Sequence, residues 1–357
     1  MHDFSKVPQV EPDVCETASG EQIFIHLLRP EDAPGIGRLF HAVYGGEYPV
    51  KRFYDPRDLL AALEMGENYS IVARKESGDI VGHLALLRSS PYPGLYECAA
   101  GLVLPGYRKA GVSLMMFDYL YERLAPELGV EAVWGESVCN HVYVQKAVMR
   151  HKHVETGLEV DLMPGETYAK EKISSGRVAS LLAFRTYVSR PHTVYIPPVY
   201  ENVFCFLYSE LDDRRTFDIS RTQAPAGVPS HGSTLVFEFA GVARINVSAI
   251  GEDFESYLNT LENETIPAGI KVIQVYLNLA CPWVAHAVEV LRSRGYFIGG
   301  ILPRWFDDDG MLMQKIVGTP GWEGIRLFSG RAEEMLRVLR RDWEEVSSNL
   351  KTGGSLN

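Results

Sequence analysis

The sequence predicts an α/β (α+β) fold with two domains, and three observations lead to this prediction. The chain has 357 residues, and about 100–200 residues per domain gives two domains. Short apolar runs typical of strands alternate with longer amphipathic segments typical of helices. In the first half, three strands are followed by a helix, a strand, a helix and a strand, and the second half has the same order. We therefore expect an internal duplication with little remaining identity.

The first domain is expected over residues 23–163, after a flexible N-terminal arm at 1–22. Asp55 and Pro56 have the residue types of a helix N-cap and first helical position, which predicts a helix that ends at Gly66. The turn Ser77-Gly78-Asp79 predicts an antiparallel hairpin. The expected elements are strand 23–28, helices 31–43 and 55–66, strands 69–73, 80–87 and 95–104, helix 112–124, strand 131–138, helix 141–149 and strand 158–163.

The second domain is expected over residues 193–346, after a connector at 164–192 that holds a short helix at 177–184. We expect residues 347–357 to form a disordered tail, because they are small and polar and lie at the chain end. The expected elements are strand 193–196, helix 200–211, strands 216–219, 234–239 and 242–250, helix 252–261, strand 272–277, helix 283–292, strands 297–302 and 311–317, and helix 332–346.

Composition and charge exclude several classes of function. The chain has 35 Lys and Arg against 46 Asp and Glu, a net charge of −11, which repels nucleic-acid phosphates and anionic lipid head groups. The 5 cysteines are scattered without the spacing of a zinc site or a disulfide framework. No apolar run approaches the roughly 18 residues that span a bilayer, and the N-terminus lacks the apolar core of a secretory signal. We expect a cytoplasmic, soluble protein.

The segment from Gly101 to Leu114 carries the most chemical information. An apolar strand ends there, and a loop of small residues leads directly into a helix. The first backbone N–H groups of a helix have no partner within it, and together with the helix dipole they form an anion site suited to a pyrophosphate. Gly111 lets the backbone approach a ligand closely, and Arg108 and Lys109 add positive charge.

The pattern Arg108-x-x-Gly111-x-Ser113 in this setting resembles the acyl-CoA loop of the GNAT superfamily of N-acetyltransferases, Gln/Arg-x-x-Gly-x-Gly/Ala. The element order over 22–163 matches that superfamily as well, whereas Ser113 departs from its Gly or Ala. The resemblance implies two GNAT-like domains, each a mixed, mostly antiparallel twisted sheet flanked by helices. It also implies that a splayed pair of parallel strands holds CoA in the first domain, with acetyl-CoA as co-substrate and no metal.

The resemblance also implies which residues bind CoA. The strand end would contact the pantetheine arm and the thioester, the amides of residues 109–113 would hold the pyrophosphate, and an Asn after the next strand would contact pantetheine. The expected cofactor-binding residues are Leu102, Val103, Leu104, Arg108, Lys109, Ala110, Gly111, Val112, Ser113 and Asn140.

Acyl transfer to an amine needs a group that takes the proton of the amine. Glu97, on the strand that leads to the loop, is the first candidate base, and Glu136, on the next strand, is the second. Both are also compatible with solvated strand positions. Tyr143 is the candidate acid for the leaving thiolate, although it lies at least one helical turn before the position of the family's tyrosine, which is Val148 here. His141 and water are the alternatives.

Two segments of the second half are acidic. The loop that matches the phosphate loop carries the carboxylates Glu252 and Asp253, which repel a pyrophosphate, so we expect a degenerate domain without a CoA site. For Asp307-Asp308-Asp309-Gly310 we expect a solvated hairpin turn, with attraction of a cationic substrate as the alternative. The basic stretch 150–153 contains two histidines, which do not share a helix face and so do not predict a metal site.

The expected function is that of an acyl-CoA-dependent N-acyltransferase, which transfers acetyl from acetyl-CoA directly to a primary amine of a small molecule or peptide. The alternatives are a non-catalytic acyl-CoA-binding or regulatory protein and a GNAT-like transferase that uses another activated acyl donor. The expected partners are the amine acceptor and a second copy of the chain in a homodimer, without nucleic acid or membrane.

Overall fold

The structure is a computed structural model that describes residues 7–17, 20–165, 176–211, 213–221, 223–266 and 269–353. It divides into two compact units. Unit 1 comprises Met1–Gly135 and Arg150–Lys152, and unit 2 comprises Glu136–Met149 and His153–Asn357. These units do not coincide with the predicted domains 23–163 and 193–346, which rest on element order and stay a prediction. The mixed, mostly antiparallel α/β fold class is confirmed in both units.

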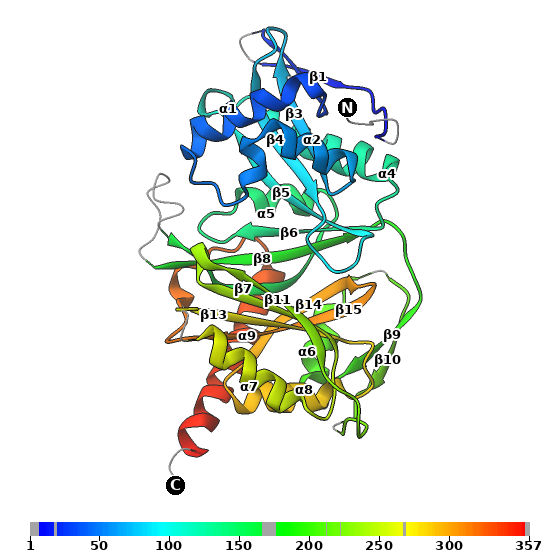
Figure 1. The fold of residues 1–357 in the computed structure, drawn as a ribbon, viewed down its shortest axis with the longest axis vertical. Coiled ribbons are helices and arrows are strands. Elements are labelled where there is room, and N and C mark those ends of the chain that lie inside the picture. The colour runs from blue at the N-terminus through cyan, green and yellow to red at the C-terminus, as the bar shows by residue number, and fades with distance from the viewer. Residues whose placement is uncertain are drawn as a thin grey trace. The chain divides into compact units, whose positions relative to one another are not determined.

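Unit 1 is built on a sheet with the strand order β1-β2-β3-β4-β5-β6 (Figure 1). Neighbours are antiparallel as far as β5, whereas β5 and β6 run parallel. The strands are β1 (Asp13–Glu16), β2 (Gln22–Leu27), β3 (Asn68–Lys75), β4 (Ile80–Leu87), β5 (Leu95–Val103) and β6 (Ala132–Val138), whose last residues belong to unit 2. The helices are α1 (Ala33–Tyr44), α2 (Pro56–Glu64), α3 (Val112–Tyr119) and α4 (Ala125–Glu127), with a π-helical turn at Leu120–Leu124.

Helices cover both faces of this sheet. In β4, the ring of His83 packs against Phe40 of α1, with 5.2 Å between ring centroids. A Cβ atom on the preceding Gly82 would lie 3.1 Å from Met116 of α3. Because successive strand residues point to opposite faces, α1 and α3 lie on opposite sides of the sheet. The predicted start of α2 is confirmed, since the Asp55 side chain accepts from the amide of the second helical residue and Pro56 occupies the first position.

The arm predicted to be flexible contains a strand. Residues Asp13–Glu16 form β1 and pair antiparallel with β2. Asp13 forms an ion pair with Arg123, and the hydroxyl of Tyr119 donates to the carbonyl of Val10 over 3.3 Å. The prediction of flexibility is therefore wrong for this stretch, because these contacts fix it to the π-helical turn and to α3. Residues 1–6 and 18–19 of the predicted arm lie outside the described residues.

Unit 2 is built on a sheet with the strand order β8-β7-β14-β15-β13-β12-β11. In this sheet β12 and β13 run parallel, and β9 and β10 form a separate two-stranded parallel sheet. The strands are β7 (Val154–Pro164), β8 (Arg177–Thr186), β9 (His192–Ile196), β10 (Arg215–Ile219), β11 (His231–Phe237), β12 (Val242–Ala249), β13 (Val272–Asn278), β14 (Phe297–Phe306) and β15 (Asp308–Ile316). The helices are α5 (Tyr143–Arg150), α6 (Glu201–Tyr208), α7 (Phe254–Thr265), α8 (Val284–Ser293) and α9 (Gly330–Gly353).

Strands β7 and β14 repeat the same irregularities, which supports the predicted duplication. The register shifts between Glu155 and Gly157 in β7 and between Ile298 and Gly300 in β14. The register shifts again between Glu159 and Met163 in β7 and between Leu302 and Phe306 in β14. Positive φ angles occur at Asp161 (54°) in β7 and Arg304 (59°) in β14. In each of these pairs, the residue of β14 follows that of β7 by the same number of positions. A conserved pattern of bulges at equal spacing is expected for two copies of one strand.

Strands β7 and β14 meet at two glycines. Gly157 of β7 pairs with Gly300 of β14, and a Cβ atom on Gly300 would lie 2.3 Å from the Cα atom of Gly157. No real Cβ atom tolerates that distance, so this pairing requires glycine at position 300. The sheet of unit 2 is therefore continuous across the junction of the two repeated strands.

The predicted helix at 177–184 is wrong, because these residues belong to β8. Val178–Phe184 are almost all apolar and buried. A continuous apolar run of this length fits either a buried strand or a buried helix, and pairing with β7 decides for the strand. The tail prediction is also wrong for residues 347–353, which continue α9. Residues 166–175 of the predicted connector and 354–357 of the predicted tail lie outside the described residues.

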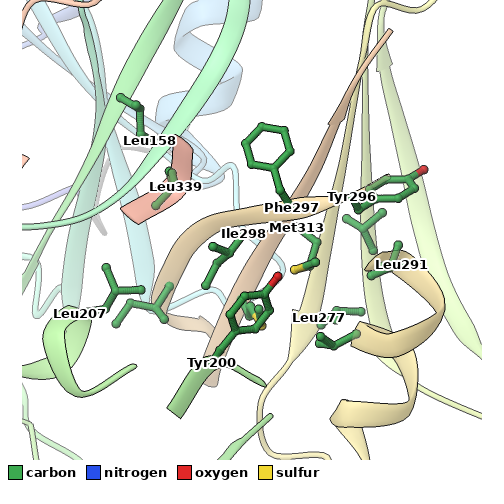
Figure 2. Packing of buried hydrophobic residues seen from close by; sticks show 14 of the residues in the cluster. Leu158, Tyr200, Leu207, Leu277, Leu291, Tyr296, Phe297, Ile298, Met313 and Leu339 are labelled. Carbon is green, nitrogen blue, oxygen red and sulfur yellow. The ribbon is translucent and has the colours of Figure 1, made fainter. Parts of the chain in front are cut away.

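The core of unit 2 is formed by its sheet together with residues of the helices α6, α7, α8 and α9. Figure 2 shows Tyr200 and Leu207 from the α6 region beside Ile298 of β14 and Met313 of β15. Leu339 of α9 belongs to the same cluster. None of the helices in the described part of the chain combines the length and apolar character that a bilayer-spanning segment needs.

Asp309 is buried, contrary to the solvated turn that we predicted for residues 307–310. Its side chain is 0% exposed. It accepts from Arg215 Nε over 2.6 Å and from the hydroxyl of Tyr208 over 2.9 Å, and it lies 3.1 Å from His192 Nε2. Burial alone raises the pKa of Asp309, but the Arg215 charge and the hydrogen bonds from His192 and Arg215 outweigh it. They hold this pKa well below its ordinary value.

We expect Asp309→Asn to lower the free energy of unfolding at pH 7 by about 3 kcal/mol, because it leaves the buried Arg215 with only one of its two carboxylate partners, Asp213. A carboxyl with a depressed native pKa stabilises the fold above its unfolded pKa of about 4 and loses that contribution as the pH falls. The difference between wild type and variant in urea unfolding therefore shrinks below pH 4.

The matched control is Asp308→Asn, since Asp308 is 32% exposed and pairs with Arg190 on the surface. We expect a loss of less than about 1 kcal/mol for it. Equal losses in the two variants would contradict a special role of the buried carboxylate.

Candidate functional site

The predicted anion loop joins β5 to α3 within unit 1. After β5, Pro105–Tyr107 form a short 3₁₀ turn, and Gly111 is the N-cap of α3. Gly111 has φ 77° and ψ −4°, a left-handed conformation in which a residue with a Cβ atom is strained. No side chain caps the helix start. The glycine therefore ends the loop and leaves the first turn of α3 uncovered.

The backbone N–H groups at the start of α3 are the main feature of this loop. The first amide of the helix with a backbone partner is that of Met115, which donates to Gly111 O over 3.1 Å. Within the described ranges, the amides of Val112, Ser113 and Leu114 have no hydrogen-bond partner. The first residues of a helix lack partners within it, and here no other part of the described chain supplies one. These amides form an electropositive cradle, which we call the α3 cradle.

The remaining loop residues define the limits of the α3 cradle. The amide of Ala110 donates to Tyr107 O over 3.1 Å, and its predicted contact with pyrophosphate stays a prediction. Arg108 donates from Nε to Val103 O over 3.1 Å, so this part of its guanidinium faces the strand end. Lys109 is exposed. A Cβ atom on Gly111 would meet nothing within 4 Å, so the loop is open at this point.

The end of β5 is held in place from β4. Leu102 and Val103 are buried, and the amide of Leu104 donates to Val81 O over 2.9 Å. The register between β4 and β5 shifts between His83 and Ala85, which places a bulge in β5 just before its end. Of the three residues that were predicted to contact pantetheine, Leu102 and Val103 belong to β5, and Leu104 follows it directly.

His83 supports this bulge. Ala100, within the bulge, has φ 53°, and its carbonyl lies 2.8 Å from His83 Nδ1. A carbonyl only accepts, so Nδ1 carries the hydrogen and donates. His83 Nε2 then accepts from the hydroxyl of Ser70, at 2.9 Å. Burial lowers the pKa of His83 to about 4, against the opposing effect of the Ala100 hydrogen bond, so the ring is neutral at pH 7.

Glu97 lies where β5 leaves its parallel neighbour. The pairing between β5 and β6 runs from Leu95 and Ala132 to Glu97 and Trp134, all within unit 1. Strand β5 then continues to Val103. The short parallel pair that the resemblance implies is therefore present, and the side chain of Glu97 is half-buried.

The second candidate base, Glu136, belongs to unit 2 and forms an ion pair. Arg244 Nη2 lies 2.9 Å from Glu136 Oε1 and also 2.9 Å from Glu159 Oε1. Gln274 Nε2 and the hydroxyl of Tyr276 donate to the same oxygen of Glu159. Glu136 is thus one member of a largely buried network and not the isolated, solvated strand residue of the alternative prediction.

Sequence reasoning missed Glu159 and Arg244. Burial, together with the negative charge of Glu136, raises the pKa of Glu159 to about 8 against the opposing effect of Arg244. The Oε2 atom of Glu159 is buried and has no partner among the described residues. The signal in the sequence was a carboxylate inside the apolar run 158–163, since a charged residue in a buried strand needs a partner.

Asn140 and Tyr143 lie at the junction of β6 and α5, in unit 2. Asn140 is 2% exposed, and neither atom of its carboxamide has a partner in the described part of the chain. Tyr143 is the first residue of α5 and is 76% exposed. Its ring lies 5.2 Å from that of His141. The loop and Glu97 thus belong to unit 1, whereas Glu136, Asn140 and Tyr143 belong to unit 2.

Two loop amides that precede α7, the helix that the predicted duplication matches to α3, bond within the chain. The amide of Gly251 donates to Ser230 Oγ over 3.0 Å, and that of Glu252 donates to Val228 O over 3.2 Å. Strands β12 and β13 pair from Val242 and Val272 to Val247 and Leu277. That this half binds no CoA stays a prediction, which rests on the carboxylates of Glu252 and Asp253.

No metal site is found in the part of the chain that the structure describes. Groups of three or more His, Cys, Asp or Glu side chains that could hold an ion do not occur there. His151 lies 3.3 Å from Asp118, whereas His153 Nδ1 bonds to the carbonyl of Val148.

Comparisons with known proteins concern the fold. No protein-family model and no curated protein sequence matches the chain. Among solved structures, a ribosomal-protein-S5-alanine acetyltransferase from Vibrio fischeri has 10% identity and a TM-score of 0.39, and covers 49% of this chain and 96% of its own. A spermidine N-acetyltransferase from Vibrio cholerae, in complex with CoA and spermine, has 12% identity and a TM-score of 0.37, and covers 46% of this chain and 95% of its own.

An aminoglycoside 6'-N-acetyltransferase with coenzyme A is similar in the same way, with 12% identity, a TM-score of 0.35, and coverage of 47% of this chain and 99% of its own. These neighbours are GNAT acetyltransferases, and each covers about half of the chain. At such low identities and TM-scores the likeness says nothing about the substrate of this protein.

We expect Gly111→Ala to weaken the binding of inorganic pyrophosphate by about tenfold, measured by isothermal titration calorimetry. A Cβ atom at a positive φ costs about 1–2 kcal/mol, and relief of that strain would move the free amides of α3. Gly106→Ala is the matched control, because Gly106 lies in the same loop with open space around it and without a positive φ. Equal affinities of the two variants would contradict the cradle.

We expect the wild-type protein to lose about 3 kcal/mol of unfolding free energy between pH 6.5 and pH 4 through His83. Its native pKa of about 4 lies below the ordinary 6.5, so the unfolded state binds the proton first as the pH falls. His83→Phe should show a smaller slope in this range in urea unfolding at several pH values. Equal slopes would show that the ring does not titrate as expected.

Proposed function

We propose that the protein is an acyl-CoA-dependent N-acyltransferase that transfers acetyl from acetyl-CoA to a primary amine. The observation that carries this proposal is the α3 cradle, with the unpartnered amides of Val112, Ser113 and Leu114. Several converging N–H groups at the positive end of a helix favour a diphosphate. CoA has such a diphosphate, and the strand that precedes the loop in this chain ends beside it.

The α3 cradle would bind the diphosphate, and exposed Lys109 would add a positive charge. In this proposal the ordered strand end Leu102–Leu104 contacts the pantetheine arm and the thioester. The bulge held by His83 sets the direction of that strand end. These residues hold and orient the co-substrate, while the acyl group of the co-substrate supplies the reactive carbonyl.

In the proposed reaction the nitrogen of a neutral amine attacks the thioester carbonyl. The new C–N bond forms, the proton of the amine goes to Glu97, and the C–S bond breaks to release CoA thiolate. Glu97, on the strand that leads to the loop, stays the first candidate base, and Glu136, which pairs with Arg244, stays the second. Tyr143 stays the candidate acid that protonates the thiolate, with water as the alternative.

The proposed acceptor is the primary amine of a small molecule or peptide. The net charge of −11 favours encounters with cationic molecules over nucleic acids. The cysteines at 15, 98, 139, 205 and 281 are free thiols, which supports a reducing compartment such as the cytoplasm.

A non-catalytic acyl-CoA-binding protein is the second candidate function. The observation in its favour is the exposure of Tyr143, at 76%, because a general acid normally acts from a site that excludes water. Both candidates share the α3 cradle, so only turnover distinguishes them.

We expect acetyl-CoA at 100 times its dissociation constant to stabilise the protein by about 2.7 kcal/mol in thermal unfolding. Glu97→Gln should keep this stabilisation and lose turnover of an amine acceptor by about 10²–10⁴-fold, since the amide cannot take a proton. Glu127→Gln, at an exposed position of α4, is the control and should keep turnover.

Two outcomes would contradict the proposal. The absence of stabilisation by acetyl-CoA and by longer acyl-CoAs would exclude CoA binding. Binding by wild type without turnover of any amine in a panel of small amines and peptides would favour the acyl-CoA-binding protein.

A further inference from the structure

The strongest unused feature of unit 2 is a segment of the second half that holds the junction between β6 and α5. We call Arg326–Phe328, which lie between β15 and α9, the strap. The amide of Arg326 donates to Cys139 O over 2.7 Å. Cys139 immediately precedes Asn140, so the strap is bonded directly beside the turn in which Asn140 lies.

Gln145 makes the remaining bonds between α5 and the strap. Its Nε2 donates to the carbonyl of Arg326, and its Oε1 accepts from the amide of Phe328, each over 2.9 Å. Gln145 is 0% exposed. The carboxamide thus bridges an N–H and a C=O of the strap as a backbone peptide group would, and Nε2 also reaches His141 O at 3.2 Å.

Both ends of the segment that contains the strap are fixed as well. On one side, the amide of Gly321 donates to the carboxylate of Asp161. On the other side, Ser329 donates to Glu155, and Arg331 Nε donates to the carbonyl of Glu155 over 2.9 Å. The strap is therefore held between two points on β7 and can act as a rigid support.

A similar bond is found at the junction between β13 and α8. Cys139 directly follows β6 and Leu279 directly follows β13. The amide of Cys139 donates to Ala179 O, and that of Leu279 donates to Asp309 O, so the two residues have equivalent positions. The carbonyl of Leu279 accepts from the amide of Tyr195 over 2.9 Å. The segment after each repeat's last strand therefore bonds to the strand–helix junction of the other repeat.

Asn140 is the group that this support presents. A buried carboxamide without any partner is costly, and such groups are rare in proteins. A carboxamide offers a donor and an acceptor side by side, which matches a secondary amide of a ligand. The pantetheine arm of CoA contains two such amides, whereas its nucleotide part contains none.

We infer that the second half of the chain builds part of the acyl-CoA site: the strap, through Gln145, positions Asn140 to bind an amide of the pantetheine arm. This inference rests on the proposed function, because acyl-CoA is the amide-bearing ligand. Gln145 is a positioning residue, and Asn140 is the contact. The second half thus has a role in ligand binding although its own loop before α7 carries the carboxylates Glu252 and Asp253.

The test compares two probes, CoA and 3′-phospho-ADP, which has the diphosphate but lacks the pantetheine amides. We expect Gln145→Ala to weaken CoA binding about tenfold in isothermal titration calorimetry, as the loss of one ligand hydrogen bond does. Its affinity for 3′-phospho-ADP should not change. Asn140→Ala should give the same pattern, and the double variant should bind CoA no more weakly than Asn140→Ala alone.

Gln314→Ala is the matched control. Gln314 is also 0% exposed, and its carboxamide likewise bridges an N–H and a C=O, those of Val160 and Leu158, each over 2.9 Å. It should lose thermal stability as Gln145→Ala does while keeping its CoA affinity.

The outcomes separate the two proposals. If the wild-type protein binds neither probe, the proposed function fails. If it binds both, and Gln145→Ala either keeps its CoA affinity or loses affinity for both probes, the role of the strap is overturned. Additive losses in the double variant would likewise show that Gln145 does not act through Asn140.

Discussion

The functional interpretation depends on one physical constraint, which is that the first amides of a helix need partners from outside the helix. At α3, Gly111 adopts a left-handed conformation and no side chain caps the helix. At α7, the amide of the first helical residue, Phe254, donates to Gly251 O over 3.2 Å, and the preceding amides of Gly251 and Glu252 donate to Ser230 and Val228. The first helical amide therefore has a partner at α7, whereas that of Val112 at α3 has none among the described residues.

Much of the fold could be predicted from local signals. Asp55-Pro56 and the turn at Gly78 fix where elements begin and end, because they act through their own neighbours. The segment 177–184 could not be predicted, since an apolar run fits a strand or a helix and only its pairing with β7 decides. That residues 13–16 form strand β1 likewise depends on long-range contacts, such as the ion pair between Asp13 and Arg123.

In the candidate site, too, some features could be predicted from the sequence and others could not. The α3 cradle could be predicted because a glycine, a strand end and a helix start are adjacent in sequence. The network around Arg244 could not, because its members come from β6, β7, β12 and β13. Burial of Asp309 was missed for a similar reason, since Arg215 and His192 lie far from it in sequence.

The pairing of Gly157 with Gly300 limits how the chain can be truncated. Because β7 has β8 on one side and β14 on the other, a truncated chain that ends before the second repeat would expose a long apolar strand edge. Such edges recruit other molecules into aggregates. We therefore expect the first half of the chain to need the second half in order to stay in solution.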